Sequence, residues 1–139
     1  MRAVLDTSVV ISALRSPTGA SAALLRLFDD GIGTLLLSVA LALEYEATCW
    51  RLEHRSAIGL DDGDIEDFIN GLIDIAEPVE MHFRLRPRLS DPGDEMVLET
   101  AVNGRAEGLV TFNQKDFKAA ADFGIEVLLP KDALRRMIA

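Results

Sequence analysis

Asp6, Thr7 and Ser8 place a carboxylate and two hydroxyls directly after residues 2–5, a short apolar segment typical of a buried β-strand. A carboxylate at the buried end of a strand loses hydration and needs a hydrogen bond, a cation or a metal ion in return. Asp6 or Thr7 could meet that need locally by capping the helix that follows. A metal site is the alternative that carries chemistry, and this stretch alone does not decide between the two.

A second polar group belongs to another predicted strand, residues 108–112. It consists of Thr111, Asn113 and Asp116. In an open parallel sheet, ligands bind beyond the carboxyl ends of the strands, where the winding changes direction. We therefore expect both polar groups to lie on one rim of the sheet. The alternative is that Thr111 and Asn113 cap the short helix that carries Asp116.

The helix predicted for residues 91–104 has a strong start signal, because Asp91 can act as N-cap and Pro92 suits the first helical position. Capping explains Asp91 well but explains Asp94 less well. At helical spacing, Asp94 shares a face with apolar residues that must turn inward, namely Val97, Leu98, Ala101 and Val102. A carboxylate on the core side of a helix needs a partner, so Asp94 is a candidate for the same site.

The helix predicted for residues 39–53 carries two further acids, Glu44 and Glu46. No Lys or Arg stands three or four residues from Glu44, and the neighbours of Glu46 at that spacing are apolar too. Spacing alone therefore leaves the choice between them open. The helix is apolar nearly all round, which predicts that it lies deep in the structure.

Strand and helix signals alternate along the chain. Strands are predicted at residues 2–5, 34–38, 108–112 and 125–129, with a weaker one at 78–81. Helices are predicted at residues 9–14, 20–30, 39–53, 61–76, 91–104 and 130–138. Repeated β-α units with short apolar strands imply an α/β fold, a mainly parallel sheet covered by helices on both faces. No linker or repeat is evident, so we expect one domain over residues 1–139.

Composition is typical of ordinary globular proteins, since 49% of the 139 residues are hydrophobic and 27% are charged. The formal charge of −9 argues against a positive coat for non-specific nucleic-acid binding, but it suits an acidic metal site or a basic protein partner. Cys49 is the single cysteine, so no internal disulfide forms and a reducing cytoplasm is expected. Neither a signal peptide nor a membrane-spanning run is evident, so no membrane association is expected.

Four motifs in sequence order resemble the PIN-domain ribonucleases: VLDTS, SVALALE, DPGDEMVLETA and LVTFNQKDF. The resemblance covers essentially the whole chain, including FGIEVLLP near its end, and is closest to the toxin components of toxin–antitoxin pairs. It implies a three-layer α/β/α sandwich of Rossmann-like type. It also implies an endoribonuclease that uses one or two Mg²⁺ or Mn²⁺ ions, an RNA substrate, an antitoxin partner and a homodimer.

The resemblance also implies which residues form the site, and it selects Glu44 over Glu46. The catalytic and metal-binding acids of the family fall on Asp6, Glu44, Asp94 and Asp116. Polar residues that would orient ligands and waters fall on Thr7, Ser8, Thr111 and Asn113. Two carboxylates about 4 Å apart repel by roughly 4 kcal/mol at an effective dielectric constant of about 20, so several in one pocket require divalent cations. Many members have Asp in place of Asn113, which bears on how tightly a second ion is held.

Several arginines are candidates for contacts with RNA. Arg84, Arg86 and Arg88 precede the DPGDE motif and could neutralise phosphates beside the site. They could equally lie on an exposed edge strand or loop. Arg51 and Arg55 are weaker candidates for the same role.

Two other functions stay open beside a ribonuclease. One is a phosphoryl-transfer enzyme of the haloacid-dehalogenase type, which also has an Asp after its first strand but requires a second Asp where this chain has Ser8. The other is a non-catalytic module that keeps the fold, against which the intact set of acids argues. The apolar residues 21–28 and 39–50 predict surface that buries against a second copy or an antitoxin.

Overall fold

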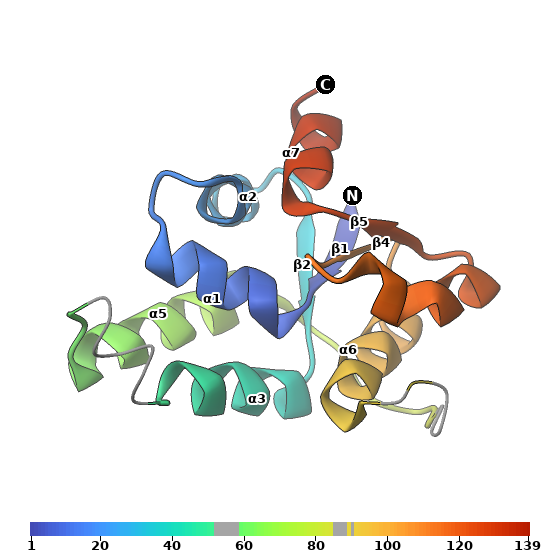
Figure 1. Ribbon diagram of the computed structural model, residues 1–139, viewed down its shortest axis with the longest axis horizontal. Coiled ribbons are helices and arrows are strands. Elements are labelled where there is room, and N and C mark those ends of the chain that lie inside the picture. The colour runs from blue at the N-terminus through green and yellow to red at the C-terminus, as the bar shows by residue number, and fades with distance from the viewer. Residues whose placement is uncertain (52–58, 85–88, 90) are drawn as a thin grey trace.

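A parallel sheet of five strands forms the centre of the part of the chain that the computed structural model describes (Figure 1). That part comprises residues 1–51, 59–84, 89 and 91–139. The strands are β1 (Arg2–Leu5), β2 (Thr34–Leu37), β3 (Glu77–Pro78), β4 (Gly108–Val110) and β5 (Glu126–Leu128). They lie in the order β3-β2-β1-β4-β5, and every adjacent pair is parallel. The chain winds outward from β1 in both directions, so the winding changes between β1 and β4.

Helices cover both faces of the sheet and produce three layers. The described helices are α1 (Thr7–Arg15), α2 (Ala20–Asp29), α3 (Val39–Cys49), α5 (Asp62–Ile75), α6 (Pro92–Asn103), the 3₁₀ helix η1 (Gln114–Phe123) and α7 (Pro130–Ile138). Figure 1 shows α1, α2, α3 and α5 on one side of the sheet and α6 with η1 on the other. α7 packs against α2. The predicted α/β/α sandwich with a parallel sheet is confirmed.

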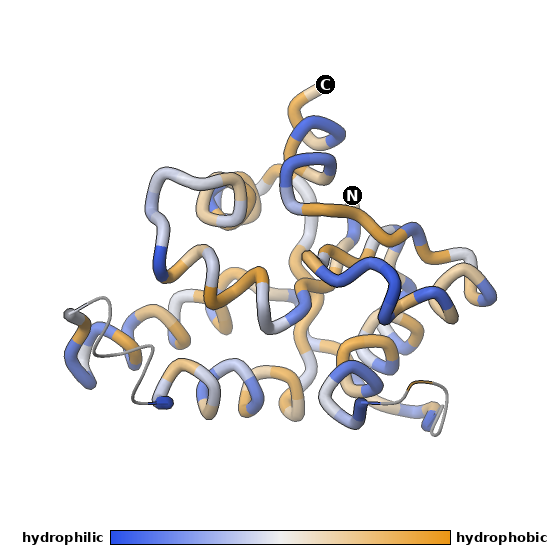
Figure 2. Tube along the Cα trace, in the orientation of Figure 1, coloured by the Kyte–Doolittle hydropathy of each residue, from blue (hydrophilic) through white to orange (hydrophobic). Residues whose placement is uncertain are grey.

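Burial explains why these short segments form strands. A parallel sheet covered on both faces favours almost continuous apolar sequence. The last three residues of β1 and all of β4 are buried, and Figure 2 shows hydrophobic residues along the central strands. The register places Leu5 beside Val110. β1 and β4 therefore end at the same level, and the residues that follow them are neighbours.

Polar N-caps fix where α3 and α6 begin. Asp91 caps α6 as predicted, because its Oδ1 accepts hydrogen bonds from the N–H groups of Gly93 (2.7 Å) and Asp94 (3.3 Å). Ser38 caps α3, because its Oγ accepts a hydrogen bond from the N–H of Leu41 (3.2 Å). These caps set the starts of the helix that carries Glu44 and of the helix that carries Asp94.

The position of α3 differs from the prediction that it lies deep in the structure. α3 belongs to an outer layer, and Val39 and Leu43 are 78% and 60% exposed. Its inner face packs on α1, α5 and α6, whereas its outer apolar face is not covered by the described chain. Residues 21–28 are predicted as a partner surface, but the chain itself covers their apolar side chains. Leu24 and Phe28 of α2 are buried, and α2 packs between α1 and α7, so we expect no partner surface there.

Some elements are shorter than predicted. β3 spans Glu77–Pro78 rather than 78–81, although the N–H of Val79 still donates to the C=O of Leu37 (2.9 Å). α3 ends at Cys49, and the end predicted for it at residue 53 lies outside the described residues. None of the described helices has the length and apolar content needed to cross a membrane.

Candidate active site

Asp6 joins β1 to α1, and only 6% of its surface is exposed. It occupies the N-cap position of α1, yet its carboxylate bonds no helix N–H group, so the capping alternative is wrong for this side chain. Its Oδ2 instead accepts hydrogen bonds from Ser8 Oγ (2.9 Å) and Thr111 Oγ1 (2.7 Å). Thr7 is the first residue of α1 and does not cap it either. No described residue donates to Asp6 Oδ1, which leaves that oxygen available to a ligand.

Thr111 links the ends of β1 and β4. Its buried hydroxyl donates to Asp6 and accepts a hydrogen bond from the N–H of Asn113 (3.0 Å). The N–H of Asp6 donates to the C=O of Val110 (2.9 Å). The two strand ends therefore share one rim, as predicted. The side chain of Asn113 is exposed and makes no cap hydrogen bond to η1, so capping does not account for it.

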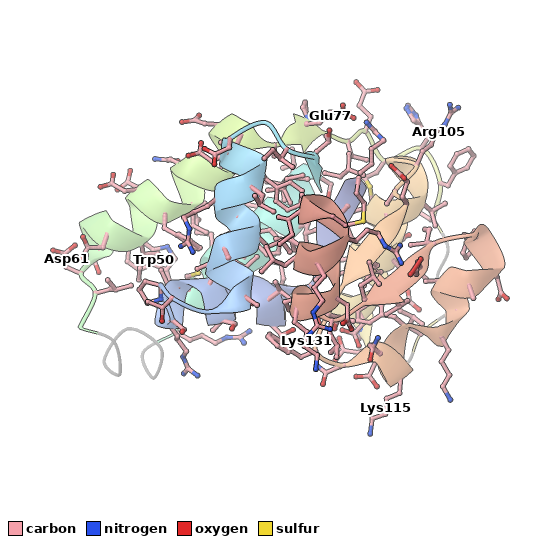
Figure 3. All side chains as sticks on the ribbon, turned by 90° about the horizontal axis from the view of Figure 1, so that it is seen from above. Trp50, Asp61, Glu77, Arg105, Lys115 and Lys131 are labelled. Carbon is pink, nitrogen blue, oxygen red and sulfur yellow. The ribbon has the colours of Figure 1, made fainter. Side chains whose placement is uncertain are left out.

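Asp94 lies in the first turn of α6 and is partly buried. Burial, followed by the negative charges of Asp6, Asp91 and Asp116, raises the pKa of its carboxyl to about 6. Asp6, Asp91 and Asp116 are thus near enough to Asp94 to act on its charge, and we call the three candidate acids among these residues, Asp6, Asp94 and Asp116, the acidic cluster. In the described part of the chain, no Lys or Arg forms an ion pair with any of the three. Lys115, next to Asp116 in sequence, projects outward from η1 (Figure 3).

Glu44 is half-buried on α3, whereas Glu46 on the same helix is exposed. The hydroxyl of Thr48 donates to Glu44 Oε1 across 3.4 Å, which is a long hydrogen bond. The charges that raise the pKa of Asp94 do not include Glu44. The structure thus places Glu44 on the partly buried side of its helix, but does not join it to the acidic cluster.

One family model matches most of the chain: the PIN domain, over residues 2–115. The chain belongs to the PIN-domain family. Neither the curated proteins nor the solved structures give a match to it. PIN domains are generally metal-dependent nucleases, and membership supports a nuclease function for this chain. The matched range contains Asp6, Glu44, Asp94 and Asn113, and it ends one residue before Asp116.

The acidic cluster of this PIN domain fits a divalent cation in its chemistry. Carboxylate oxygens are the donors that Mg²⁺ and Mn²⁺ prefer, and an un-neutralised group of acids favours a bound cation. As placed, no three Asp, Glu, His or Cys side chains among the described residues converge closely enough to hold an ion. The acidic cluster thus supplies suitable donor oxygens, but its side chains are not arranged around a common point. The metal site predicted from four acids therefore stays a prediction.

Tyr45 is a contributor to the PIN-domain site that sequence reasoning does not identify. It is buried, and its hydroxyl donates to the C=O of Leu5, the last residue of β1, which fixes α3 against the rim. Burial, followed by the charge of Asp6, raises the pKa of the Tyr45 hydroxyl well above its ordinary value, so it stays a neutral donor. The available signal was an aromatic residue beside Glu44 in a helix of mostly small apolar residues.

Buried polar groups of α6 also escape sequence reasoning. Ser38 Oγ and Thr100 Oγ1 share a hydrogen bond of 2.8 Å that ties the start of α3 to the middle of α6. Glu95 Oε1 accepts a hydrogen bond from the N–H of Leu89 (2.9 Å), which joins Leu89 to the first turn of α6. The first contact joins the helix that carries Glu44 to the helix that carries Asp94, and the second lies in the same turn of α6 as Asp94.

The backbone of Arg84 lies far from the acidic cluster. The N–H of Phe83 donates to Oδ1 of Asn103 (2.9 Å), the last residue of α6. At 1.5 Å per residue, that end of the helix is about 13 Å from the first-turn Asp94. This placement does not favour a phosphate contact by Arg84 beside the site. Three further arginines predicted to contact RNA lie outside the described residues, namely Arg55, Arg86 and Arg88.

Proposed function

We propose that this PIN domain is an endoribonuclease that hydrolyses RNA phosphodiester bonds with Mg²⁺ or Mn²⁺, and that it is the toxin of a toxin–antitoxin pair. The observation that carries the proposal is the environment of Asp6. Two hydroxyls, from Ser8 and Thr111, hold one carboxylate oxygen at 2.9 and 2.7 Å and leave the other without a described donor. Asp94 and Asp116 add negative charge to the same rim. A cation is the natural complement of this arrangement.

The four predicted acids take different parts in the proposed reaction. When bound, a divalent cation supplies an activated water for in-line attack on phosphorus and stabilises charge on the leaving 3′ oxygen. Asp6 and Asp94 would hold one ion directly or through water. Glu44 and Asp116 would hold waters of that ion or bind a second one.

Hydroxyl and amide side chains would orient these acids. Ser8 and Thr111 already bond Asp6, and such supporting hydrogen bonds tune the binding of metal ligands. Thr7 and Asn113 are proposed for the same role, but no described contact joins their side chains to the acids. Their part in the site rests on the resemblance to the family.

Thermal melting and RNA cleavage by the full chain test the proposal together. We expect Mn²⁺ to raise the Tm and to be required for cleavage of a single-stranded RNA, and we expect a chelator to abolish both effects. A DNA strand of the same sequence should be cut more slowly. If Mn²⁺ does not change the Tm and no RNA is cleaved, the alternative of a non-catalytic module is favoured. Hydrolysis of a phosphomonoester alone would favour the phosphatase alternative, to which family membership gives no support.

Glu44→Gln is expected to slow metal-dependent RNA cleavage by roughly 10-fold to 100-fold, the usual cost of losing a group that supports metal ligands. Glu46→Gln is the matched control, because it removes the same charge from an exposed position of the same helix. It should cleave like the parent. Steady-state cleavage rates of the two variants decide the matter, and equal impairment would mean that Glu44 has no special role.

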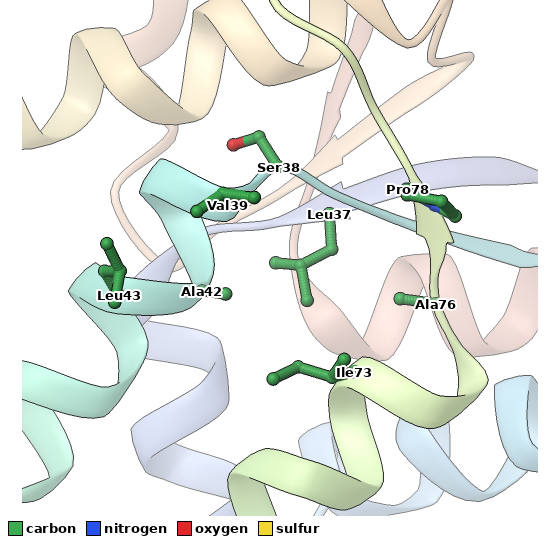
Figure 4. A pocket seen from close by; sticks show the side chains of 8 residues that line it. All are labelled: Leu37, Ser38, Val39, Ala42, Leu43, Ile73, Ala76 and Pro78. Carbon is green, nitrogen blue, oxygen red and sulfur yellow. The ribbon is translucent and has the colours of Figure 1, made fainter.

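The outer face of α3 supports the homodimer. Beside it lies a groove of about 320 Å³, lined by Leu37, Ser38, Val39, Ala42, Leu43, Ile73, Ala76 and Pro78 (Figure 4). Val39 and Leu43 are exposed apolar side chains at the margin of this apolar hollow. In a two-fold dimer, Val39 and Leu43 of each copy could pack into the groove of the other, so this surface is complementary to itself. We therefore assign this face to a second copy of the chain.

Leu43→Asp is expected to convert the dimer into a monomer, because it would bury a charge within the apolar contact. Sedimentation at micromolar concentration measures this change. Ile138→Asp, at an exposed apolar position on α7, is the control and should stay dimeric. Each copy carries a charge of −9, so added salt should tighten the parent dimer by screening repulsion. A monomeric parent would contradict the assignment.

A cognate antitoxin is the partner that the toxin proposal implies. The charge of −9 favours a basic protein by electrostatic complementarity. Expression of the chain alone should arrest growth, and co-expression of a basic protein encoded beside it should relieve the arrest. Growth that is unaffected by expression of an RNA-cleaving protein would reject the toxin role and leave the nuclease assignment in place.

A further inference from the structure

A groove of about 470 Å³ opens beside the acidic cluster, between α1, α3 and the turn that follows β4. Four residues with hydroxyl groups line it, namely Ser8, Ser12, Ser16 and Thr48. Two of them connect it with the candidate acids, because Ser8 donates to Asp6 (2.9 Å) and Thr48 donates to Glu44 (3.4 Å). The groove therefore borders two of the candidate metal-binding acids.

One face of α1 forms the length of this groove. Ser8 and Ser12 are four residues apart and lie on one side of the helix, and Ser16 follows directly after its last residue, Arg15. Ile11 is buried between them and forms an apolar floor. Arg15 adds a positive charge towards the far end. Hydroxyl and guanidinium groups are common partners of nucleic-acid sugars and phosphates.

Phe112 forms the other wall of the groove. It is 48% exposed and follows Thr111, whose hydroxyl bonds Asp6. An exposed ring gains by covering its apolar surface, and unpaired bases commonly stack on such rings. Phe112 thus presents an aromatic surface beside a run of hydroxyls, next to the candidate catalytic residues.

We propose that this groove binds the nucleotide next to the cleaved phosphate, with its base stacked on Phe112 and its backbone along the serines of α1. The inference rests on the proposed nuclease function and requires an unpaired strand, because a base inside a duplex cannot offer its face to Phe112. A protein partner fits this groove less well than it fits the groove beside α3, where Ser38 is the one polar residue in the described lining.

Binding of a fluorescent single-stranded RNA, measured in a chelator so that no cleavage occurs, tests the stacking. Phe112→Leu keeps an apolar side chain but removes the ring, and we expect about 10-fold weaker binding. Phe112→Trp should bind at least as tightly as the parent. Phe83→Leu is the matched control, because Phe83 is 62% exposed at the opposite end of α6, and it should bind like the parent. Equal binding by Phe112→Leu and the parent would overturn the proposal.

A series of RNAs with one abasic nucleotide at successive positions then locates the stacked base. At one position, loss of the base should weaken binding to the parent by about as much as Phe112→Leu does, and should not affect that variant further. Equal sensitivity of parent and variant at every position would overturn the proposal. So would a changed oligomeric state of Phe112→Leu in sedimentation, which would assign Phe112 to a protein interface. Ring-dependent binding without cleavage in Mn²⁺ would reject the nuclease function alone.

Discussion

Asp6→Asn is expected to abolish metal-dependent RNA cleavage and to leave the fold intact. The amide oxygen of Asn can still accept the hydrogen bonds that Ser8 and Thr111 now donate to the carboxylate. The negative charge that attracts a divalent ion is lost, and the repulsion with Asp94 is lost with it. We expect a Tm in chelator at least equal to that of the parent. Cleavage should be at least roughly 100-fold slower, because even residues that only support ligands contribute 10-fold to 100-fold.

Melting with and without Mn²⁺ separates this role from a structural one. At a Mn²⁺ concentration roughly 100-fold above the Kd, binding to the folded state alone stabilises the parent by about 2.7 kcal/mol. Most of that gain should disappear in Asp6→Asn. Asp122→Asn removes an exposed acid of η1 and should behave like the parent in both measurements. An Asp6→Asn variant that keeps the shift and the cleavage would remove the central residue of the proposed site.

The meeting of Asp6 with Thr111 is predictable, although the two residues are 105 positions apart. Apolar segments mark both strands, polar residues mark their ends, and parallel strands bring their carboxyl ends to one edge. Asp91 is predictable for a different reason, because a cap bonds the first turn of its own helix. Both predictions depend on rules that need no knowledge of side-chain packing.

Side-chain direction is harder to predict, since it depends on contacts between distant segments. The local rule predicts that Asp6 caps the helix, but its Oδ2 accepts hydrogen bonds from the hydroxyls of Ser8 and Thr111 instead. The choice of Glu44 over Glu46 depends on the rotation of α3, which is fixed by the contact of Tyr45 with β1.

The deep placement predicted for α3 is wrong for a related reason, whereas the partner surface predicted for the same residues stays a prediction. An all-round apolar sequence signals that a helix is covered, but it does not say by what. Val39 and Leu43 are exposed because the chain's own elements cover the opposite face of α3. A partner surface and a core surface have the same sequence pattern, and the structure is needed to tell them apart.

Asp94→Asn is expected to stabilise the metal-free protein at neutral pH and to remove a pH dependence of its stability. Burial and neighbouring acids raise the pKa of Asp94 in the folded state from 3.8 to about 6. Between these two values the folded state binds more protons than the unfolded state does, so the free energy of unfolding falls as the pH rises. Above about pH 6 the parent has lost this contribution, whereas Asn carries no charge and loses nothing.

Denaturant unfolding in a chelator, repeated at pH values from below 4 to above 6, measures this difference. The unfolding free energies of parent and Asp94→Asn should diverge as the pH rises through that window and run parallel above it. Asp116→Asn should make the window narrower, because it removes one of the charges that raise the pKa of Asp94, whereas Asp122→Asn should leave it unchanged. Mn²⁺ should reverse the order above about pH 6, because the ion stabilises only a protein whose ligand is ionised. Parallel curves for parent and Asp94→Asn across the whole range would mean that Asp94 titrates as an isolated carboxyl, and the acidic cluster would lose the residue that joins Asp6 to Asp116.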